Sequence, residues 1–137
     1  HVDAPNHYST SGVGISERSL HFYMGPCQVI SVHLKRGERI KIEHIQKIKI
    51  GAHRVLFHTG SFPNPDVWNN DFNSLSAELV DYLQAQKVCL VGIDTPSIDL
   101  ADDKALESHK RIHAHDMAIL EGIVLDQVPD GIYTLCA

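Results

Sequence analysis

Apolar residues in this chain gather into short runs separated by polar turns, and the longest runs are typical of buried strands. They are rich in β-branched residues and bounded by turn-forming residues, as expected for strands that are covered on both faces. These runs occupy residues 27–34, 54–59 and 87–94. Two shorter strands are predicted at 123–125 and 132–135, around the turn Pro129-Asp130-Gly131.

Two other segments carry a helical pattern. In residues 74–86 the apolar positions fall on one stripe of a helix, and Ser74 or Ser76 is placed to cap its start. Residues 102–115 suit a second helix, whereas the isoleucines of residues 40–50 have a mixed spacing that leaves helix or strand open. This order predicts the α/β class: a single domain over residues 1–137, with a mixed β-sheet or barrel-like core and flanking helices.

The charge balance argues against nucleic acid as a partner. Lys and Arg number 12 against 17 Asp and Glu, a formal net charge of −5, and the basic residues of 35–49 alternate with acidic and apolar ones as on a solvated face. No apolar run approaches the roughly 20 residues that span a bilayer, so no membrane partner is expected either. Cys27, Cys89 and Cys136 are far apart and form no CxxC pair, which is typical of reduced thiols in a cytoplasmic protein.

Histidine is the compositional exception, with 10 residues in 137, and the first candidate site uses two of them. His1 and Asp3 project to the same side of an extended segment, because residues two apart share a face there. A turn at Pro5 can bring His7 back toward them. Imidazole and carboxylate are suitable ligands for zinc or a similar divalent ion. On spacing alone, scattered surface histidines explain this pattern more often than a metal site does.

The second candidate site lies near the end of the chain. His109 and His113 are four apart and share one face of the predicted helix, which suits two metal ligands but equally suits a solvated face. Glu121 lies inside the apolar run 117–125, where an unpaired buried carboxylate would be costly. A surface strand edge and a metal ligand both remain open as explanations of Glu121.

A third candidate site is the loop of residues 94–99, directly after a predicted strand. Loops at strand ends are where α/β domains build their sites. We interpret Asp99 as part of a proline-containing turn with local hydrogen bonding. Asp94 and Ser97 are expected to support the site structurally and not to take part in the chemistry.

These segments together resemble the kynurenine formamidase (cyclase-like) family of metal-dependent hydrolases. His1-Val2-Asp3-Ala4-Pro5-Asn6-His7 resembles the last seven residues of the family signature H-x-G-T-H-x-D-x-P-x-H. Four further segments fit the family in the same order, so that the resemblance covers essentially the whole chain. They are Tyr23-Met24-Gly25-Pro26-Cys27, residues 90–99, residues 102–109, and Ile119-Leu120-Glu121 with Val124-Leu125-Asp126.

The resemblance implies a cyclase-like swivelling β/β/α fold and a ligand set for one or two zinc ions, with manganese as an alternative and no organic cofactor. It implies that His1 and Asp3 bind the metal, and that His7 lies near it for proton transfer as well as ligation. It implies that His109 and Glu121 are the distal ligands. His113 and His115 have no firm counterpart in the family.

The activity implied is hydrolysis of a small-molecule formamide, N-formyl-L-kynurenine giving L-kynurenine and formate in tryptophan degradation, by a cytoplasmic homodimer or higher homo-oligomer. Two alternatives remain: a related cyclic-amide hydrolase such as isatin hydrolase with a single manganese ion, or an inactive metal-binding member. No G-x-S-x-G elbow supports a serine-hydrolase route.

The chain departs from the family signature in one respect. The first histidine of the signature lies four residues before the second, and His1 matches the second. The printed sequence begins His-Val-Asp, without an initiator Met and without the basic start and apolar stretch that are typical of a signal peptide. We therefore expect it to be a piece of a longer protein that continues at both ends.

Overall fold

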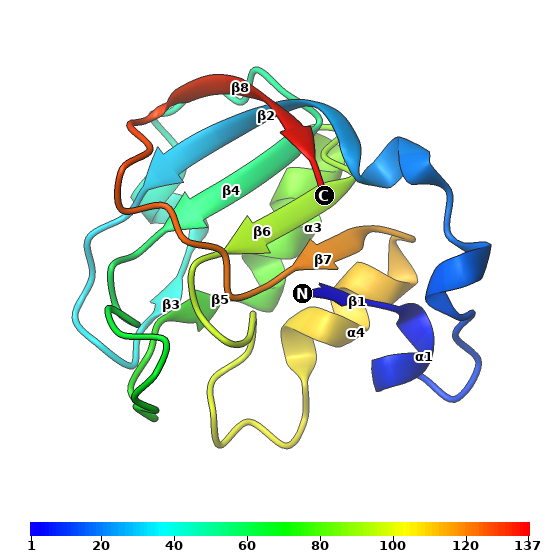
Figure 1. Cartoon of the computed structure of the whole chain (residues 1–137), viewed down its shortest axis with the longest axis horizontal. Helices are drawn as coiled ribbons and strands as arrows, with labels where there is room; N and C mark the ends of the chain where they lie inside the picture. The colour runs from blue at the N-terminus through cyan, green and yellow to red at the C-terminus, as the bar shows by residue number, and fades with distance from the viewer.

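A six-stranded mixed sheet forms the centre of the molecule, a computed structural model that describes residues 1–137 (Figure 1). Its strands follow the order β1-β7-β6-β4-β2-β8, in which the central four run parallel and the two edge strands run antiparallel. A second, two-stranded sheet pairs β3 with β5. The strands are β1 (Val2–Asp3), β2 (Met24–Ser31), β3 (Arg39–Ile40), β4 (Arg54–His58), β5 (Ser74–Leu75), β6 (Leu90–Ile93), β7 (Ala118–Leu120) and β8 (Gly131–Cys136).

Helices connect these strands, and the two longest are α3 and α4. Ser76 caps α3, because its side chain accepts a hydrogen bond from the Leu79 backbone N–H. None of the helices combines the length and the apolar sequence that a membrane-spanning helix requires. The helices are α1 (Pro5–Tyr8), α2 (Ile42–Ile45), α3 (Ala77–Ala85) and α4 (Glu107–Ala114), with 3-10 turns η1 (Ile15–Glu17) and η2 (Leu20–Phe22).

Alternation along the central strands divides the core between the two faces of the sheet. Val55, Phe57 and Val91 belong to one buried cluster, to which α3 and α4 supply residues such as Leu79 and Ile112. The alternate positions form the second cluster on the opposite face; they include Cys27, Val29, Leu56, Leu90, Ala118 and Leu120. The strands are therefore buried on both sides, as their continuous apolar runs predict.

The predicted class, a mixed sheet with flanking helices, is confirmed, and the sheet is open with β1 and β8 as its edges. The three main strands, the helix capped at Ser76 and the strand at 132–135 all appear within a few residues of the predicted bounds. Residues 40–50, which the pattern leaves open, contribute the end of β3 and the short helix α2.

Two predicted elements differ from the structure. Residues 123–125 are not a strand, because Gly122 takes a left-handed φ of 65° and turns the chain away after β7. Helix α4 begins at Glu107 and not near 102, because the Asp103 carboxylate accepts hydrogen bonds from the Ala105 and Leu106 N–H groups and holds a turn there.

Candidate metal centre

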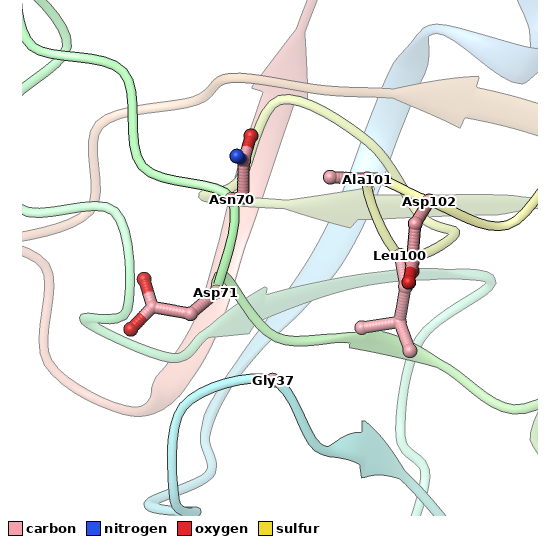
Figure 2. A pocket seen from close by; sticks show the side chains of 6 residues that line it. All are labelled: Gly37, Asn70, Asp71, Leu100, Ala101 and Asp102. Atoms are coloured by element: carbon pink, nitrogen blue, oxygen red, sulfur yellow. The ribbon is translucent and has the colours of Figure 1, made fainter.

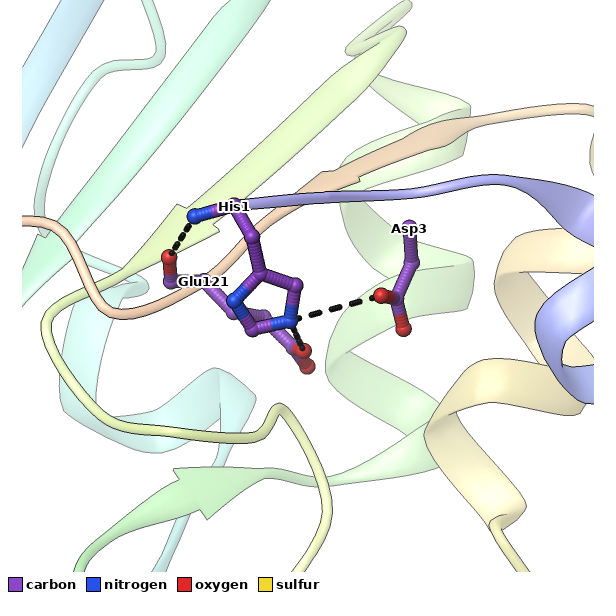
Figure 3. Close-up of side chains that lie close together, drawn as sticks. All are labelled: His1, Asp3 and Glu121. Atoms are coloured by element: carbon purple, nitrogen blue, oxygen red, sulfur yellow. Dashed lines mark hydrogen bonds and ion pairs between the residues drawn. The ribbon is translucent and has the colours of Figure 1, made fainter.

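Pairing of β1 with β7 places His1 directly opposite Glu121. The His1 backbone nitrogen donates to the Glu121 carbonyl at 2.9 Å, and the Glu121 N–H donates to the His1 carbonyl at 2.9 Å. Asp3, two residues farther along β1, shares the face of His1. His1 Nε2 consequently lies 3.2 Å from Glu121 Oε2 and 3.4 Å from Asp3 Oδ1 (Figure 3).

Helix α4 adds His109 to this group. Its Nε2 atom lies 3.5 Å from Asp3 Oδ2 and 3.6 Å from Glu121 Oε1. Asp3, His109 and Glu121 are buried, whereas the His1 side chain is 59% exposed and faces solvent. Side chains from β1, α4 and the end of β7 thus converge from positions as far apart as 1 and 121 in the sequence.

The loop after β6 holds both distal members of the group in place. The Ile98 N–H donates to Glu121 Oε1 at 2.7 Å. Asp99 accepts two hydrogen bonds from His109, one from its ring Nδ1 at 2.8 Å and one from its backbone N–H at 3.1 Å. Because Nδ1 faces Asp99, the other ring nitrogen is directed at Asp3 and Glu121, as in metal-binding histidines supported by a carboxylate.

Burial and charge shift the pKa values of these groups strongly. Burial raises the pKa of Glu121 to about 7, although His109 opposes the shift. Burial alone would lower the pKa of His109, but its contacts with Asp3 and Asp99 and the charge of Glu121 outweigh that effect and raise the pKa to about 9. Burial also works against the charge of Asp99, yet hydrogen bonds from His109 and Arg39 hold the pKa of that carboxyl well below its usual range.

The donor set fits a divalent cation. Two buried carboxylates and two imidazoles are ligands that zinc and related ions take. The only charged partners of Asp3 and Glu121 are histidines, and no lysine or arginine pairs with either carboxylate. His1, Asp3 and Glu121 offer ligand atoms that all lie within 4.8 Å of one another. A cation at this point would offset the repulsion between the two carboxylates.

The other histidines named from the sequence lie outside this group. The structure does not bring the His7 side chain into it: His7 is exposed on α1, the helix that follows β1. His113 pairs with Ser9 at 3.1 Å, and His115 pairs with Asp81 at 2.7 Å.

The loop of residues 94–99 differs in part from its prediction. Asp94 braces it as expected, by accepting hydrogen bonds from Thr59 and the Gly60 N–H. Asp99 forms the predicted local turn through its backbone, because its N–H donates a hydrogen bond to Ser97 Oγ at 3.1 Å. Its carboxylate, however, is fully buried against His109 and Arg39, a role that the sequence prediction missed. Asp99 and His109 are ten residues apart across a loop, and no periodic pattern in the sequence indicates that their side chains meet.

Two hollows lie near this region. One, of about 520 Å³, is lined by Gly37, Asn70, Asp71, Leu100, Ala101 and Asp102 and contains none of the converging residues (Figure 2). The other, of about 110 Å³, is lined in part by Gly122 and Ile123, which directly follow Glu121, and by Phe62 and Asp94. The smaller hollow therefore shares the segment that follows Glu121, and the larger one shares the segment that follows Asp99, but none of the four converging side chains lines either hollow.

Residues 1–100 match the model of the Cyclase family, described as "Putative cyclase". The chain belongs to this cyclase family. This chain is also 42% identical, over 138 aligned residues, to the kynurenine formamidase of Erythrobacter litoralis (strain HTCC2594). The match covers 100% of the chain and 62% of that relative, so the chain spans less than two thirds of its length.

Solved structures of the same fold agree with this membership. A potential metal-dependent hydrolase with cyclase activity superposes with a TM-score of 0.85 at 26% identity, covering 96% of this chain and 65% of the other. A predicted metal-dependent hydrolase from Bacillus stearothermophilus gives 0.77 at 28% identity, covering 96% and 63%. An isatin hydrolase gives 0.67 at 17% identity, covering 96% and 62%, a likeness that shows the fold alone.

Proposed function

We propose that the protein is a metal-dependent amidohydrolase that converts N-formyl-L-kynurenine to L-kynurenine and formate, a step of tryptophan degradation. The observation that carries the proposal is the convergence of His1, Asp3, His109 and Glu121 on one point. The 42% identity to a kynurenine formamidase supports the choice of substrate.

His1, Asp3, His109 and Glu121 would hold one or two zinc ions, or manganese. When bound, such a cation activates water at neutral pH and stabilises negative charge on the amide oxygen. The chain itself keeps Asp3, His109 and Glu121 out of bulk solvent, while the exposed His1 side leaves an approach for substrate.

Hydrolysis breaks the bond between the formyl carbon and the aryl nitrogen. The water oxygen goes to formate, and the departing nitrogen takes up a proton. We assign that proton to His7, which the sequence resemblance places near the metal. Its position on α1, directly after the strand that carries His1 and Asp3, and its exposure to solvent support a role in proton delivery more than one in ligation.

The test is metal content and hydrolysis by the full-length protein. We expect bound zinc or manganese and release of formate from N-formylkynurenine, lost on chelation and restored by the metal. Preferential ring opening of isatin would instead support the cyclic-amide alternative. Metal binding without hydrolysis of either compound would support an inactive metal-binding member.

Replacing His7 by asparagine tests the proton-transfer role. We expect the variant to keep its metal and KM but to lose about 100-fold or more in kcat, since a positioned proton donor contributes roughly 10²–10⁴-fold. Metal stoichiometry and steady-state kinetics provide the measurement. His33→Asn is the control, because His33 is also exposed and lies outside the candidate centre. Unchanged kcat in His7→Asn would exclude the role.

The proposal includes a cytoplasmic homodimer or larger homo-oligomer. The three cysteines are unpaired, which supports a reducing compartment. Large apolar side chains such as Leu20, Trp68 and Val124 are more than 60% exposed, which supports association with another copy. Light scattering of the full-length protein measures the assembly directly.

A further inference from the structure

A chain of buried polar contacts leads from β3 to the candidate metal ligand His109. Arg39 Nη1 lies 2.8 Å from Asp99 Oδ1, and the same nitrogen donates to the Leu75 carbonyl at 2.7 Å. Asp99 in turn contacts His109. Arg39 therefore reaches His109 only through Asp99, and the Arg39 side chain is only 20% exposed.

Both oxygens of the Asp99 carboxylate are fully engaged. Oδ1 accepts from Arg39 and from the Ser108 N–H at 3.1 Å, and Oδ2 accepts from the ring and the backbone of His109. Four donors from two directions leave the carboxylate no freedom to rotate. Among these donors, Arg39 alone approaches from outside the helix that carries His109, and its guanidinium brings a permanent positive charge to the carboxylate.

The second arm of Arg39 holds the start of the same helix. Arg39 Nη2 pairs with the Asp103 carboxylate, whose other oxygen accepts from the Ala105 and Leu106 N–H groups just before α4. The guanidinium is planar, so its two arms set a defined spacing between the two carboxylates. One side chain therefore fixes both the orientation of Asp99 and the turn from which α4 begins.

We propose that Arg39 is a positioning residue for His109: by anchoring Asp99 it keeps the His109 Nδ1–H donated to Asp99 and Nε2 presented to the metal. The inference rests on the proposed metal centre. Outer partners of ligating histidines typically contribute 10–100-fold in metal affinity. Arg39 acts through one such partner, so we expect its loss to cost about tenfold.

The experiment compares Arg39→Met with Arg39→Lys in the full-length protein. Zinc affinity is measured by competition with a chromophoric chelator, and the His109 Nδ1–H is followed by NMR in the zinc-loaded form. We expect Arg39→Met to lower the affinity about tenfold and to weaken or lose the Nδ1–H signal through faster exchange. Arg39→Lys, which keeps a cation for Asp99, should recover the affinity to within about threefold.

Arg111→Met is the matched control. Arg111 lies on α4 as His109 does, but it is 53% exposed and pairs with Asp81 at the surface. The Arg111→Met variant should keep the zinc affinity and the His109 Nδ1–H signal of the wild type. Arg39→Gln replaces Arg39→Met if the latter does not fold, with the same expected losses.

Wild-type zinc affinity with an intact Nδ1–H signal in the uncharged Arg39 variant would overturn the positioning role. Equal affinity losses in the charged and uncharged variants, with the signal intact, would also overturn it and assign Arg39 a purely structural role. If the wild-type protein itself binds no zinc or manganese, the proposed metal centre fails instead, so the two failures are distinguishable.

Discussion

Replacing Glu121 by glutamine will remove tight metal binding and, with it, hydrolysis. Glu121 contributes a buried carboxylate oxygen 3.2 Å from His1 and 3.6 Å from His109, and glutamine keeps the shape but not the charge. We expect zinc affinity to fall by more than the roughly 10–100-fold that follows loss of an outer partner, since the change is made at a direct ligand. Chelator competition and formate release measure the two effects.

The same variant should fold normally, which separates a ligand role from a structural one. Burial raises the pKa of Glu121 to about 7, so the ionised carboxylate gains little from its surroundings without a metal. Glutamine can still accept the hydrogen bond from the Ile98 N–H. We expect the metal-free stability of Glu121→Gln to lie within about 1–2 kcal/mol of wild type.

Glu107→Gln is the control for Glu121→Gln. It makes the same chemical change at an exposed position two residues before His109 and should alter neither stability nor zinc affinity. Wild-type zinc affinity in Glu121→Gln would contradict the proposed ligand set.

Zinc binding at pH 8 will release about one proton, most of it from His109. The pKa of His109 is raised to about 9 by its contacts with Asp3 and Asp99, so the ring is still protonated at that pH, whereas Glu121, near 7, is mostly ionised. The metal needs the neutral ring and displaces the proton. Apparent affinity should therefore rise about tenfold per pH unit up to about 9. Calorimetry in buffers of different ionisation enthalpy counts the protons.

The stability of the metal-free protein should change with pH in the opposite direction. The folded-state pKa of His109 lies above its unfolded value of about 6.5. Its contribution is therefore fully present below about pH 6.5 and is lost as the pH rises through about 9, by roughly 3 kcal/mol. Urea unfolding across this range measures the loss.

His115→Gln serves as the control for both pH measurements. His115, which directly follows α4, pairs with Asp81 on α3 and lies away from the candidate centre. Its replacement should leave proton release at pH 8 and the pH dependence of stability as in wild type. Zinc binding without proton release at pH 8 would mean that His109 is not the group displaced.

The sheet could be predicted closely because its strands are covered on both faces, and continuous runs such as 54–59 and 87–94 follow directly from that burial. The predicted bounds were wrong where a single local feature of the chain decides where an element begins or ends. Gly122 ends β7 by a left-handed turn, although apolar residues continue to Leu125. The Asp103 carboxylate delays the start of α4, although the polar pattern is compatible with an earlier one.

The candidate centre divides in the same way. The juxtaposition of His1 and Asp3 follows from the two-residue period of a strand, which the sequence expresses. Placing Glu121 beside them required the pairing of β1 with β7, and placing His109 there required the packing of α4. His7 shows the limit of spacing: the short helix that begins at Pro5 leaves its side chain exposed and outside the group.

The residue types available for metal chemistry, the family resemblance and the buried strands could all be predicted, because they depend on composition and local periodicity. Which side chains meet could not be predicted, because it depends on tertiary packing. Asp99 and Arg39 illustrate the reason: they lie 60 residues apart, and their pairing behind His109 depends on how β3, the loop after β6 and α4 pack together. Contacts of that kind arise from folding in three dimensions and leave no regular spacing along the chain.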